Sequence, residues 1–426
     1  MTTQNNQIGK QISIAHFSWE FPPAIWGGLG TFAAELTKQQ IVQGHTVTVF
    51  AINDGNSFLP MEMQNGITVY RPKMIDITHP FSLVSNSDLQ SWGKHLSFFS
   101  DVFSYNFLSA KVLVDKISQS NNGDHVDMIE AHDWLGIFGG MMAKKELNIP
   151  LIFHVHSTEH GRSVGNGSPT IQHIEKTGAE VADGVITVSY AMKEELEQLG
   201  FPKEKIRVCW NGIDPDKYDS SKISEEQRQS LRARYGIKPD EIFLFFIGRL
   251  VTVKGIMQLV EAMPEILQQF PQVKLVVLGV GDLEDQIRSR IAELGISDHV
   301  ILRMEFISEE ERILHYAASD VVVLPSLYEP FGIVCTEAMS MEKPVVVGAR
   351  GINGMREQIV SSGEKQCGVH INPFDSYDIA WGVNSVLSSP EKWKTMGQQG
   401  RRRVFDLFTW DHVANRALEI YQEFLR

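Results

Sequence analysis

Short runs of β-branched and aliphatic residues alternate with segments of helical periodicity along almost the whole chain. This alternation restricts the fold most strongly, because it is typical of parallel sheets whose crossover connections are helices. The sequence therefore predicts an α/β protein. In the first half the predicted strands are residues 12–17, 46–52, 67–70, 127–131, 151–155, 184–188 and 206–209. In the second half they are residues 242–247, 273–278, 300–302, 321–324, 344–347 and 368–371.

Length and linker composition divide the chain in two. A length of 426 residues favours two domains, at roughly 100 to 200 residues per domain. A polar stretch with turn residues and a charged helix, residues 214–238, separates the two strand series. We expect a first domain at residues 1–214 and a second at 215–407, two Rossmann-like doubly wound sheets that face each other across a ligand cleft. The helix expected at residues 408–426 packs against either domain, and we expect it to return to the first.

Composition excludes several classes of protein. Lys and Arg total 39 against 52 Asp and Glu, a net charge of −13 that opposes binding to nucleic acid or to an anionic membrane surface. The three cysteines, Cys209, Cys335 and Cys367, have no paired spacing, which predicts a reducing, cytoplasmic setting and no zinc cluster. No stretch approaches the roughly 18 apolar residues of a transmembrane segment. The aromatic-rich residues 97–114 form either a core-facing amphipathic helix, which we favour, or a face for peripheral membrane association.

The segment YEPFGIVCTEAMSM, residues 328–341, directly follows a predicted buried strand. Ligands of doubly wound sheets bind beyond the carboxyl ends of the strands, so this segment lies where chemistry is expected. Glu329 precedes a helix whose first amides point toward a bound polar group, and Glu337 lies about two turns into that helix. Two such carboxylates suit a polyhydroxylated ligand, one on a sugar ring and one on a ribose. The alternative is a pair of ordinary acidic residues favoured by the helix dipole.

The segment FFIGRLVTVKGIMQL, residues 245–259, also reads as strand, Gly turn and helix. Arg249 and Lys254 flank the turn, so both cations face an anion at the start of the helix, and a pyrophosphate is the obvious candidate. The alternative is a solvated surface pair.

The Gly-rich segment at residues 18–36 lets backbone approach a ligand closely. Gly28, Gly30 and Ala33 fit the pattern GxGxxA, with Asp54 as a ribose ligand, which would indicate dinucleotide binding. That pattern requires its first Gly immediately after the first strand, and here ten residues intervene. We therefore disfavour nicotinamide binding.

Histidines gather after two predicted strands, in AHDW and FHVHSTEHGR. His154, His156 and His160, with Glu159 and Asp133 nearby, predict a metal site of a hydrolase as one interpretation. The favoured interpretation is a neutral histidine that forms hydrogen bonds within the cleft, because His160 lies in a loop and no further ligand set is evident.

Together these segments resemble the retaining glycosyltransferases of the GT-B fold, specifically the glycogen-synthase-like and sucrose-synthase-like group of glycosyltransferase family 4. The resemblance spans nearly the whole chain. Its motifs occur in the family's order: GGLG, AHDW, VHSTEHGR, ADGVITVS, NGID, GRLVTVKG, PSLYEPFGIVCTEAM and NGMREQI. The combination of EPFGIVCTE with GRLxxxKG is highly specific. Where the family commonly has GGLRE, this chain has NGMRE at residues 353–357.

The resemblance implies a role for each matching residue. Arg249 and Lys254 neutralise the diphosphate of a nucleotide-sugar, Glu329 and the following amides hold the donor sugar, and Glu337 binds the ribose. The implied catalytic residues are Glu329, Lys254, Arg249, His156 and Asp133. The implied donor-binding residues are Gly28, Leu29, Arg249, Lys254, Glu305, Phe306, Phe331, Gly332, Ile333 and Glu337.

The resemblance also implies the reaction, a metal-independent transfer of a hexose with retention of anomeric configuration. UDP-glucose is the favoured donor and a saccharide the acceptor, in glucan or exopolysaccharide and envelope biosynthesis; no cofactor is implied. A glycogen or starch synthase proper is the alternative within this class. The alternatives outside it are the metal-dependent hydrolase built on the histidine cluster and a nucleotide- and glucan-binding protein without turnover.

Overall fold

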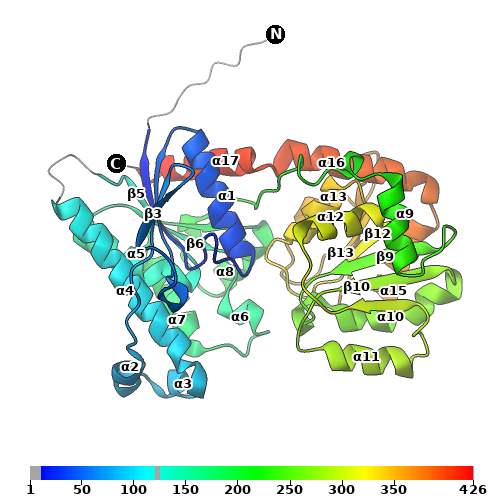
Figure 1. Ribbon diagram of the computed structural model, residues 1–426, viewed down its shortest axis with the longest axis horizontal. Helices are drawn as coiled ribbons and strands as arrows, with labels where there is room; N and C mark the ends of the chain where they lie inside the picture. The colour runs from blue at the N-terminus through cyan, green and yellow to red at the C-terminus, as the bar shows by residue number, and fades with distance from the viewer. Residues whose placement is uncertain (1–10, 120–124, 426) are drawn as a thin grey trace, which may run out of the picture. The chain divides into compact units, whose positions relative to one another are not determined.

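The computed structural model describes residues 11–119 and 125–425. They form two compact units (Figure 1). Unit 1 comprises Met1–Val188, Glu195–Cys209 and Trp410–Arg426, and unit 2 comprises Ser189–Glu194 and Trp210–Thr409. The chain thus passes briefly through unit 2 at Ser189–Glu194, leaves unit 1 again at Trp210 and returns to it at Trp410.

Unit 1 contains an eight-stranded sheet with the strand order β3-β4-β2-β1-β5-β6-β7-β8. All neighbouring strands are parallel apart from β3 and β4. The strands are β1 Ser13–Phe17, β2 Thr46–Phe50, β3 Met61–Gln64, β4 Ile67–Tyr70, β5 Met128–His132, β6 Leu151–Val155, β7 Gly184–Thr187 and β8 Ile206–Val208. The helices are α1 Gly28–Val42, α2 Thr78–Val84, α3 Ser87–Gln90, α4 Leu96–Gln119, α5 Asp133–Leu147, α6 Glu159–Arg162, α7 Pro169–Val181, α8 Tyr190–Gln198 and α17 Trp410–Gln422, of which α8 begins in unit 2.

Strand β3 is absent from the predicted strands. Its sequence MEMQ has no β-branched residue, and its residues are exposed or half-buried because it lies at the edge of the sheet. The sequence feature that indicates β3 is the Asn-Gly turn that connects it to β4. Asn65 and Gly66 have φ values of 49° and 87°, and a two-residue type I′ turn requires positive φ at both positions.

The C-terminal helix α17 packs on the sheet of unit 1 beside α1, where Figure 1 draws it in red. Its buried face, which includes Trp410, Val413 and Ile420, shares one apolar cluster with Phe32 of α1 and Ile14 of β1. Burial of such a face stabilises the folded state by about 25 cal/mol per Å² of apolar surface removed from water. The amphipathic pattern of this last segment therefore covers the first domain, although it follows the second in sequence.

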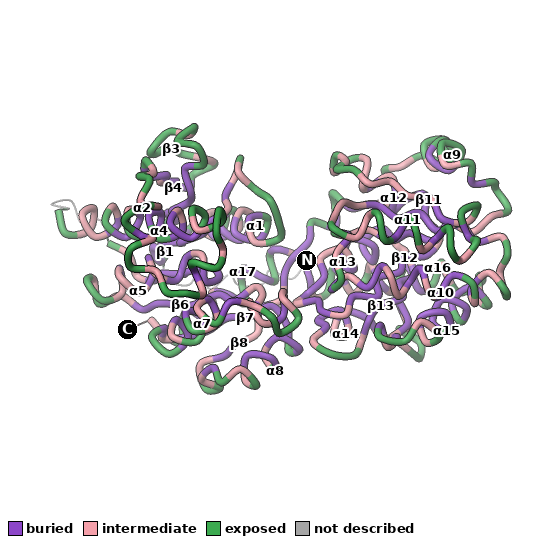
Figure 2. Tube along the Cα trace, turned by 90° about the horizontal axis from the view of Figure 1, so that it is seen from below, coloured by how far each residue is buried: buried purple, intermediate pink, exposed green. Residues whose placement is uncertain are grey.

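Unit 2 contains a six-stranded, fully parallel sheet with the order β11-β10-β9-β12-β13-β14. The strands are β9 Ile242–Ile247, β10 Val273–Leu278, β11 Val300–Arg303, β12 Val321–Leu324, β13 Val345–Gly348 and β14 Gly368–Ile371. The helices are α9 Glu225–Arg234, α10 Ile256–Gln269, α11 Glu284–Glu293, α12 Glu309–Ala318, α13 Ile333–Ser340, α14 Met355–Gln358, α15 Ser376–Leu387 and α16 Trp393–Leu407. Figure 2 shows the strands buried beneath helices whose outer sides are exposed.

These two doubly wound parallel sheets confirm the predicted α/β fold class. Every predicted strand is present within a residue or two of its expected ends. In α4 the inward face buries Phe99, Val102 and Tyr105, whereas Phe103 and Phe107 remain exposed. Within the described ranges, no helix is both long and apolar enough to span a bilayer.

Candidate functional site

In unit 2 the candidate site lies where the strand order reverses, between β9 and β12. Crossovers on the two sides of this point run in opposite directions, so the loops after the two strands separate and leave room for a ligand. The loop after β9 carries Arg249 and Lys254, and the loop after β12 carries Glu329. The predicted cation loop and carboxylate loop are thus neighbours at one edge of one sheet.

Lys254 and Glu329 form an ion pair through Nζ and Oε2. The Lys254 side chain is 20% exposed to solvent and the Glu329 side chain is 9% exposed, so solvent screens the charge interaction only partly. Ser326 Oγ donates a second hydrogen bond, of 3.3 Å, to Glu329 Oε2. Arg249 is exposed, and in the part of the chain that the structure describes no side-chain ion pair or hydrogen bond occupies its guanidinium.

Lys254 ends a single 3-10 turn, Thr252–Lys254, which closes on Gly255. Gly255 has φ 69°, and a Cβ at this position would lie 1.9 Å from the carbonyl oxygen of Pro325. Only glycine therefore fits between the cation loop and the segment leading to Glu329. This close approach explains why GRLVTVKG ends on glycine.

The NGMRE segment holds the backbone from Ser326 to Glu329. Gly354 N–H donates to Glu329 O at 2.7 Å, and Asn353 Nδ2 donates to Ser326 O at 2.7 Å. Gly332, with φ 94°, is the N-cap of α13, and a Cβ there would lie 2.5 Å from Met355 Cγ. Asn353 is fully buried. The sequence shows that Asn stands here where the family commonly has Gly, but it does not show that the side chain holds the Ser326 carbonyl.

The other residues predicted to bind the donor near Glu329 differ in how far their side chains are exposed to solvent. The Phe331 side chain is buried against Phe408, which leaves only its backbone to contact a ligand. Ile333 is the first residue of α13 and is half-buried. Phe306 is 89% exposed, and Glu305 accepts a hydrogen bond from Arg303 Nε at 2.7 Å.

Glu337 is buried and already has protein partners. Its Oε1 accepts from Tyr218 O–H at 2.9 Å and its Oε2 accepts from Tyr316 O–H at 2.7 Å, with Arg312 Nη2 3.3 Å from Oε1. Burial and the Glu337 charge raise the pKa of both tyrosines, so they stay donors. A carboxylate offers about four acceptor positions, so these bonds leave capacity for a ligand hydroxyl. None of these three partners was predicted from the sequence.

In unit 1 a buried polar cluster lies at the carboxyl ends of β1, β5 and β6. It contains His156 and His154, whose rings stack at 4.3 Å between centroids, and His132, His16 and Glu130. Of these, only His154 and His156 were singled out by the sequence analysis. His16 and Glu130 lie inside predicted strands, His132 directly follows one, and all three are fully buried, so strand alternation alone does not separate them from core residues.

Asp133 orients the segment that carries His156. It adopts φ 52° at the junction of β5 and α5, and its Oδ1 accepts the His156 backbone N–H at 2.7 Å. Burial raises the pKa of Asp133, while Arg162, with Nη1 4.0 Å from Oδ2, opposes that shift. Asp133 therefore fixes the loop after β6.

Burial determines the charge of the histidines. It lowers the pKa of His132 and of His156 well below the ordinary value, so both are neutral near pH 7. Burial opposes ionisation of Glu130, but the hydrogen bond from His154 and the surrounding imidazoles outweigh it and lower the Glu130 pKa. The cluster thus holds a buried carboxylate, Glu130, whose hydrogen bonds and charge interactions offset the cost of its burial.

At the Gly-rich loop, α1 begins at Gly28, with Leu29 half-exposed beside it. Glu20, which the sequence analysis did not single out, accepts the backbone N–H groups of Trp26 and Gly27 at 3.0 and 2.9 Å. These bonds shape the loop that leads into Gly28 and Leu29, the first two residues of the helix.

The histidine geometry differs from the predicted hydrolase set. His132, His154 and His156 place one nitrogen each within 4.8 Å of one another, close enough to share a metal ion. Within the described residues His160 does not join that group; it lies in α6. The candidate ligand set is therefore shifted from His160 to His132.

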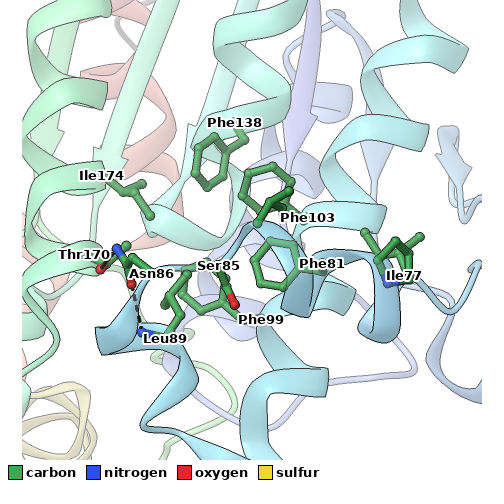
Figure 3. A pocket seen from close by; sticks show the side chains of 12 residues that line it. Ile77, Phe81, Ser85, Asn86, Leu89, Phe99, Phe103, Phe138, Thr170 and Ile174 are labelled. Carbon is green, nitrogen blue, oxygen red and sulfur yellow. Dashed lines mark hydrogen bonds between the residues drawn. The ribbon is translucent and has the colours of Figure 1, made fainter.

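A separate apolar pocket of about 600 Å³ lies among α2, α4, α5 and α7 of unit 1 (Figure 3). Phe81, Phe99, Phe103 and Phe138 line it, and none of its lining residues is titratable. It contains neither the histidine cluster nor the Gly-rich loop, so it supplies no chemistry to the candidate site.

Comparisons with known proteins agree along the chain. The family model of Glycosyltransferase Family 4 matches residues 26–217, and that of glycosyl transferases group 1 matches residues 227–403. An uncharacterized glycosyltransferase of Methanocaldococcus jannaschii is 32% identical over 96% of this chain and 98% of its own length. A glycogen synthase of Mycobacterium tuberculosis is 27% identical over 95% of this chain and 93% of its own.

The fold agrees as well. HepE of Anabaena, solved in complex with UDP and glucose, superposes with a TM-score of 0.71 at 22% identity, over 97% of this chain and the whole of that one. The two doubly wound sheets, the paired cation and carboxylate loops and the full-length likeness lead to one conclusion: the chain belongs to the glycosyltransferases and has the GT-B fold, with a Family 4 segment followed by a group 1 segment.

Proposed function

We propose that this glycosyltransferase transfers a hexose, most favourably glucose from UDP-glucose, to a saccharide acceptor with retention of anomeric configuration. The observation that carries the proposal is the ion pair of Lys254 and Glu329 at the strand-order reversal of unit 2. A cation and a carboxylate held side by side match the two chemically different parts of a nucleotide-sugar, its diphosphate and its hydroxylated ring.

Each part of the donor has a proposed contact. Lys254 and the exposed Arg249 bind the diphosphate, and Glu329 together with the amides of Gly332 and Ile333 binds hydroxyls of the sugar. Glu337 accepts a ribose hydroxyl in addition to its tyrosine partners. We also propose that the nucleobase lies against Glu305 and Phe306, and that Gly28 and Leu29 approach the donor phosphate or sugar. His156 would lie near the reacting face of the sugar, and Asp133 would shape the acceptor side.

In the proposed reaction the bond between the anomeric carbon and the phosphate oxygen breaks and a bond to the acceptor oxygen forms on the same face. The transition state resembles an oxocarbenium ion, and negative charge develops on the leaving diphosphate. Arg249 and Lys254 stabilise that charge, and the diphosphate oxygen takes the acceptor's proton. The two cations supply the stabilisation, so we propose neither a metal ion nor a cofactor.

The preference for glucose and UDP is supported by HepE, whose solved structure holds both, and by the glycogen synthase relative. That relative also supports the alternative of a glycogen or starch synthase proper, which extends a glucan. We place the reaction in the cytoplasm, since the three cysteines are buried and form no disulfide within the described residues, as a reducing setting favours.

The test is release of nucleoside diphosphate from a panel of UDP-, ADP- and GDP-sugars, with glucan and oligosaccharide acceptors. Wild type is compared with Glu329→Ala and with Glu364→Ala, which alters an exposed carboxylate of the same unit. Release from one donor that Glu329→Ala abolishes and Glu364→Ala retains is expected, and proton NMR of the product gives its anomeric configuration. Release that survives Glu329→Ala contradicts the proposal.

A metal-dependent hydrolase remains a second candidate, and the proximity of His132, His154 and His156 favours it. It requires stoichiometric bound metal and loss of activity in chelator. Metal analysis of the purified protein and the release assay with chelator separate the two: chelator-resistant transfer supports the glycosyltransferase mechanism proposed above, and chelator-sensitive hydrolysis supports the second candidate.

A further inference from the structure

Three large aromatic side chains at the start of helix α15 in unit 2 are exposed to solvent. Tyr377 and Trp381 lie four positions apart on this helix and so share one face, and Phe374 stands in the loop just before it. Their exposed fractions are 59% for Phe374, 75% for Tyr377 and 58% for Trp381. We call these three residues the aromatic row.

The packing of α15 does not account for the aromatic row. The inner face of the helix is buried in the core of unit 2, where α15 packs against α10 (Figure 1). The outer face of such a helix normally carries polar residues. Neither the Tyr377 hydroxyl nor the Trp381 indole N–H has a hydrogen-bond partner among the described residues. Exposed aromatic side chains that gather in this way mark an interaction site.

The charges beside the aromatic row favour an uncharged ligand. Residues 371–389 carry two charged side chains, Asp375 and Asp378, and both are acidic. An anionic membrane surface or a nucleic acid is bound through Lys and Arg, so neither suits this segment. Asp375 accepts the Tyr377 backbone N–H and Asp378 accepts that of Asn372, which leaves acceptor positions on both carboxylates.

The size of the aromatic row argues against a second copy of this chain as its partner. Its three side chains expose on the order of 400 Å² in total, given the usual area of a large aromatic side chain. A stable interface between proteins buries about 800 Å² on each partner. Farther along α15 the exposed residues are Ser385 and Ser388, so the apolar surface does not continue.

Phe374 connects the aromatic row to the candidate site of the same unit. A Cβ on Gly351 would lie 3.5 Å from the Phe374 ring and 3.4 Å from the Leu327 carbonyl oxygen. The ring therefore lies against backbone that faces the carboxylate loop. The next residue, Ile352, accepts the Glu329 backbone N–H at 3.0 Å. The aromatic row thus begins beside the segment that carries Glu329 and continues along α15.

We propose that the aromatic row binds a neutral glycan chain. The C–H face of a sugar ring packs on the negative face of an aromatic ring, and its hydroxyls bond to the Tyr377 hydroxyl, the Trp381 N–H and the carboxylates of Asp375 and Asp378. That this glycan is the polymeric acceptor rests on the proposed function, whereas glycan binding itself does not. A long acceptor held here has a raised local concentration near the donor-binding loops, and a short acceptor gains nothing from it.

Binding is measured by electrophoresis of the full chain in native gels that contain glycogen, dextran or hydroxyethyl cellulose. At least one of these polysaccharides should retard wild type. Tyr377→Ala and Trp381→Ala should each weaken that affinity about tenfold, since truncating a central aromatic contact commonly costs that much. Trp381→Phe keeps a ring and should restore most of it. Phe405→Ala, which removes an exposed ring of α16 in the same unit, is the matched control and should be retarded like wild type.

The release assay separates glycan binding from donor binding. With the polysaccharide that retards wild type as acceptor, Tyr377→Ala and Trp381→Ala should raise the acceptor KM about tenfold. The donor KM, and kcat with a disaccharide acceptor, should stay unchanged. Because both side chains are exposed, the variants should fold like wild type, and thermal unfolding verifies this.

The proposal is overturned if none of the three polysaccharides retards wild type, or if both alanine variants are retarded equally with it. Binding to phosphatidylglycerol vesicles or self-association that Trp381→Ala abolishes, without retardation by polysaccharide, would also overturn it and would assign the face to a lipid surface or to a second copy. Absence of release from every donor would contradict the proposed function instead, and the gel retardation would still test the glycan site.

Discussion

Lys254 and Glu329, 75 positions apart, form an ion pair that joins the loops after the two strands flanking the strand-order reversal of unit 2. The pair balances a cation and a carboxylate at a partly exposed edge, where each retains access to a ligand. The glycines around it remove the side chains that would keep the two loops apart.

Lys254→Ala should lower kcat for donor release by about 10²–10³-fold, the usual loss when one group that stabilises transition-state charge is removed. Steady-state kinetics with the preferred donor measure this. Lys238→Ala removes an exposed lysine of the same unit and should be neutral. Near-normal turnover by Lys254→Ala would refute the assigned role.

Glu337→Gln should weaken donor binding and destabilise unit 2. The amide keeps one acceptor oxygen for the two tyrosine hydroxyls and removes the charge beside Arg312. Because one buried hydroxyl then lacks an acceptor, the free energy of unfolding should fall by about 1–3 kcal/mol. Nucleotide titration and thermal unfolding measure the two effects. Glu293→Gln, at a side chain that is 62% exposed, is the control; equal behaviour of the two variants would contradict the prediction.

Gly255→Ala should be far more destabilising than Gly236→Ala. The two glycines have nearly equal φ, 69° and 68°, so both variants carry the same left-handed strain of roughly 1–2 kcal/mol. At Gly236 no atom lies within 4 Å of the added Cβ, whereas at Gly255 the Pro325 carbonyl is 1.9 Å away. Chemical denaturation compares stabilities and donor titration compares affinities. Similar losses for both would show that the close approach has no role.

Glu175→Gln tests the electrostatics around Asp133. Burial raises the pKa of Glu175 from 4.5 to about 8, against the opposing charge of Arg162. The folded state therefore binds the proton more tightly, and this contribution to stability is complete below pH 4.5 and lost as pH rises through about 8. The slope is at most about 1.4 kcal/mol per pH unit.

Since Gln has no charge to bury, Glu175→Gln should gain stability relative to wild type as pH increases from 5 to 8.5. Denaturation midpoints across that range measure the difference. Glu180→Gln, on the exposed side of the same helix, should show no such trend. A constant difference between Glu175→Gln and wild type would disprove the raised pKa.

Much of this protein follows from local sequence. The predicted strands form because apolar β-branched runs such as residues 321–324 are stable only when buried in a sheet. The loops with Lys254 and Glu329 follow such runs, so their place at the carboxyl edge was predictable too. Strand β3 was not predicted, because an exposed edge strand needs no apolar pattern. Its sequence signal is the Asn-Gly turn that follows it.

The partners of the site residues were decided by the tertiary structure alone. Glu337 meets Tyr218, 119 positions away, and Glu130 meets Tyr421, 291 positions away. The sequence by itself determined which segments become strands, turns and loop-borne polar groups, since propensity and burial pattern act within a few residues. Only folding selected which of many tyrosines and histidines meet, because a hydrogen bond depends on positions fixed by distant packing.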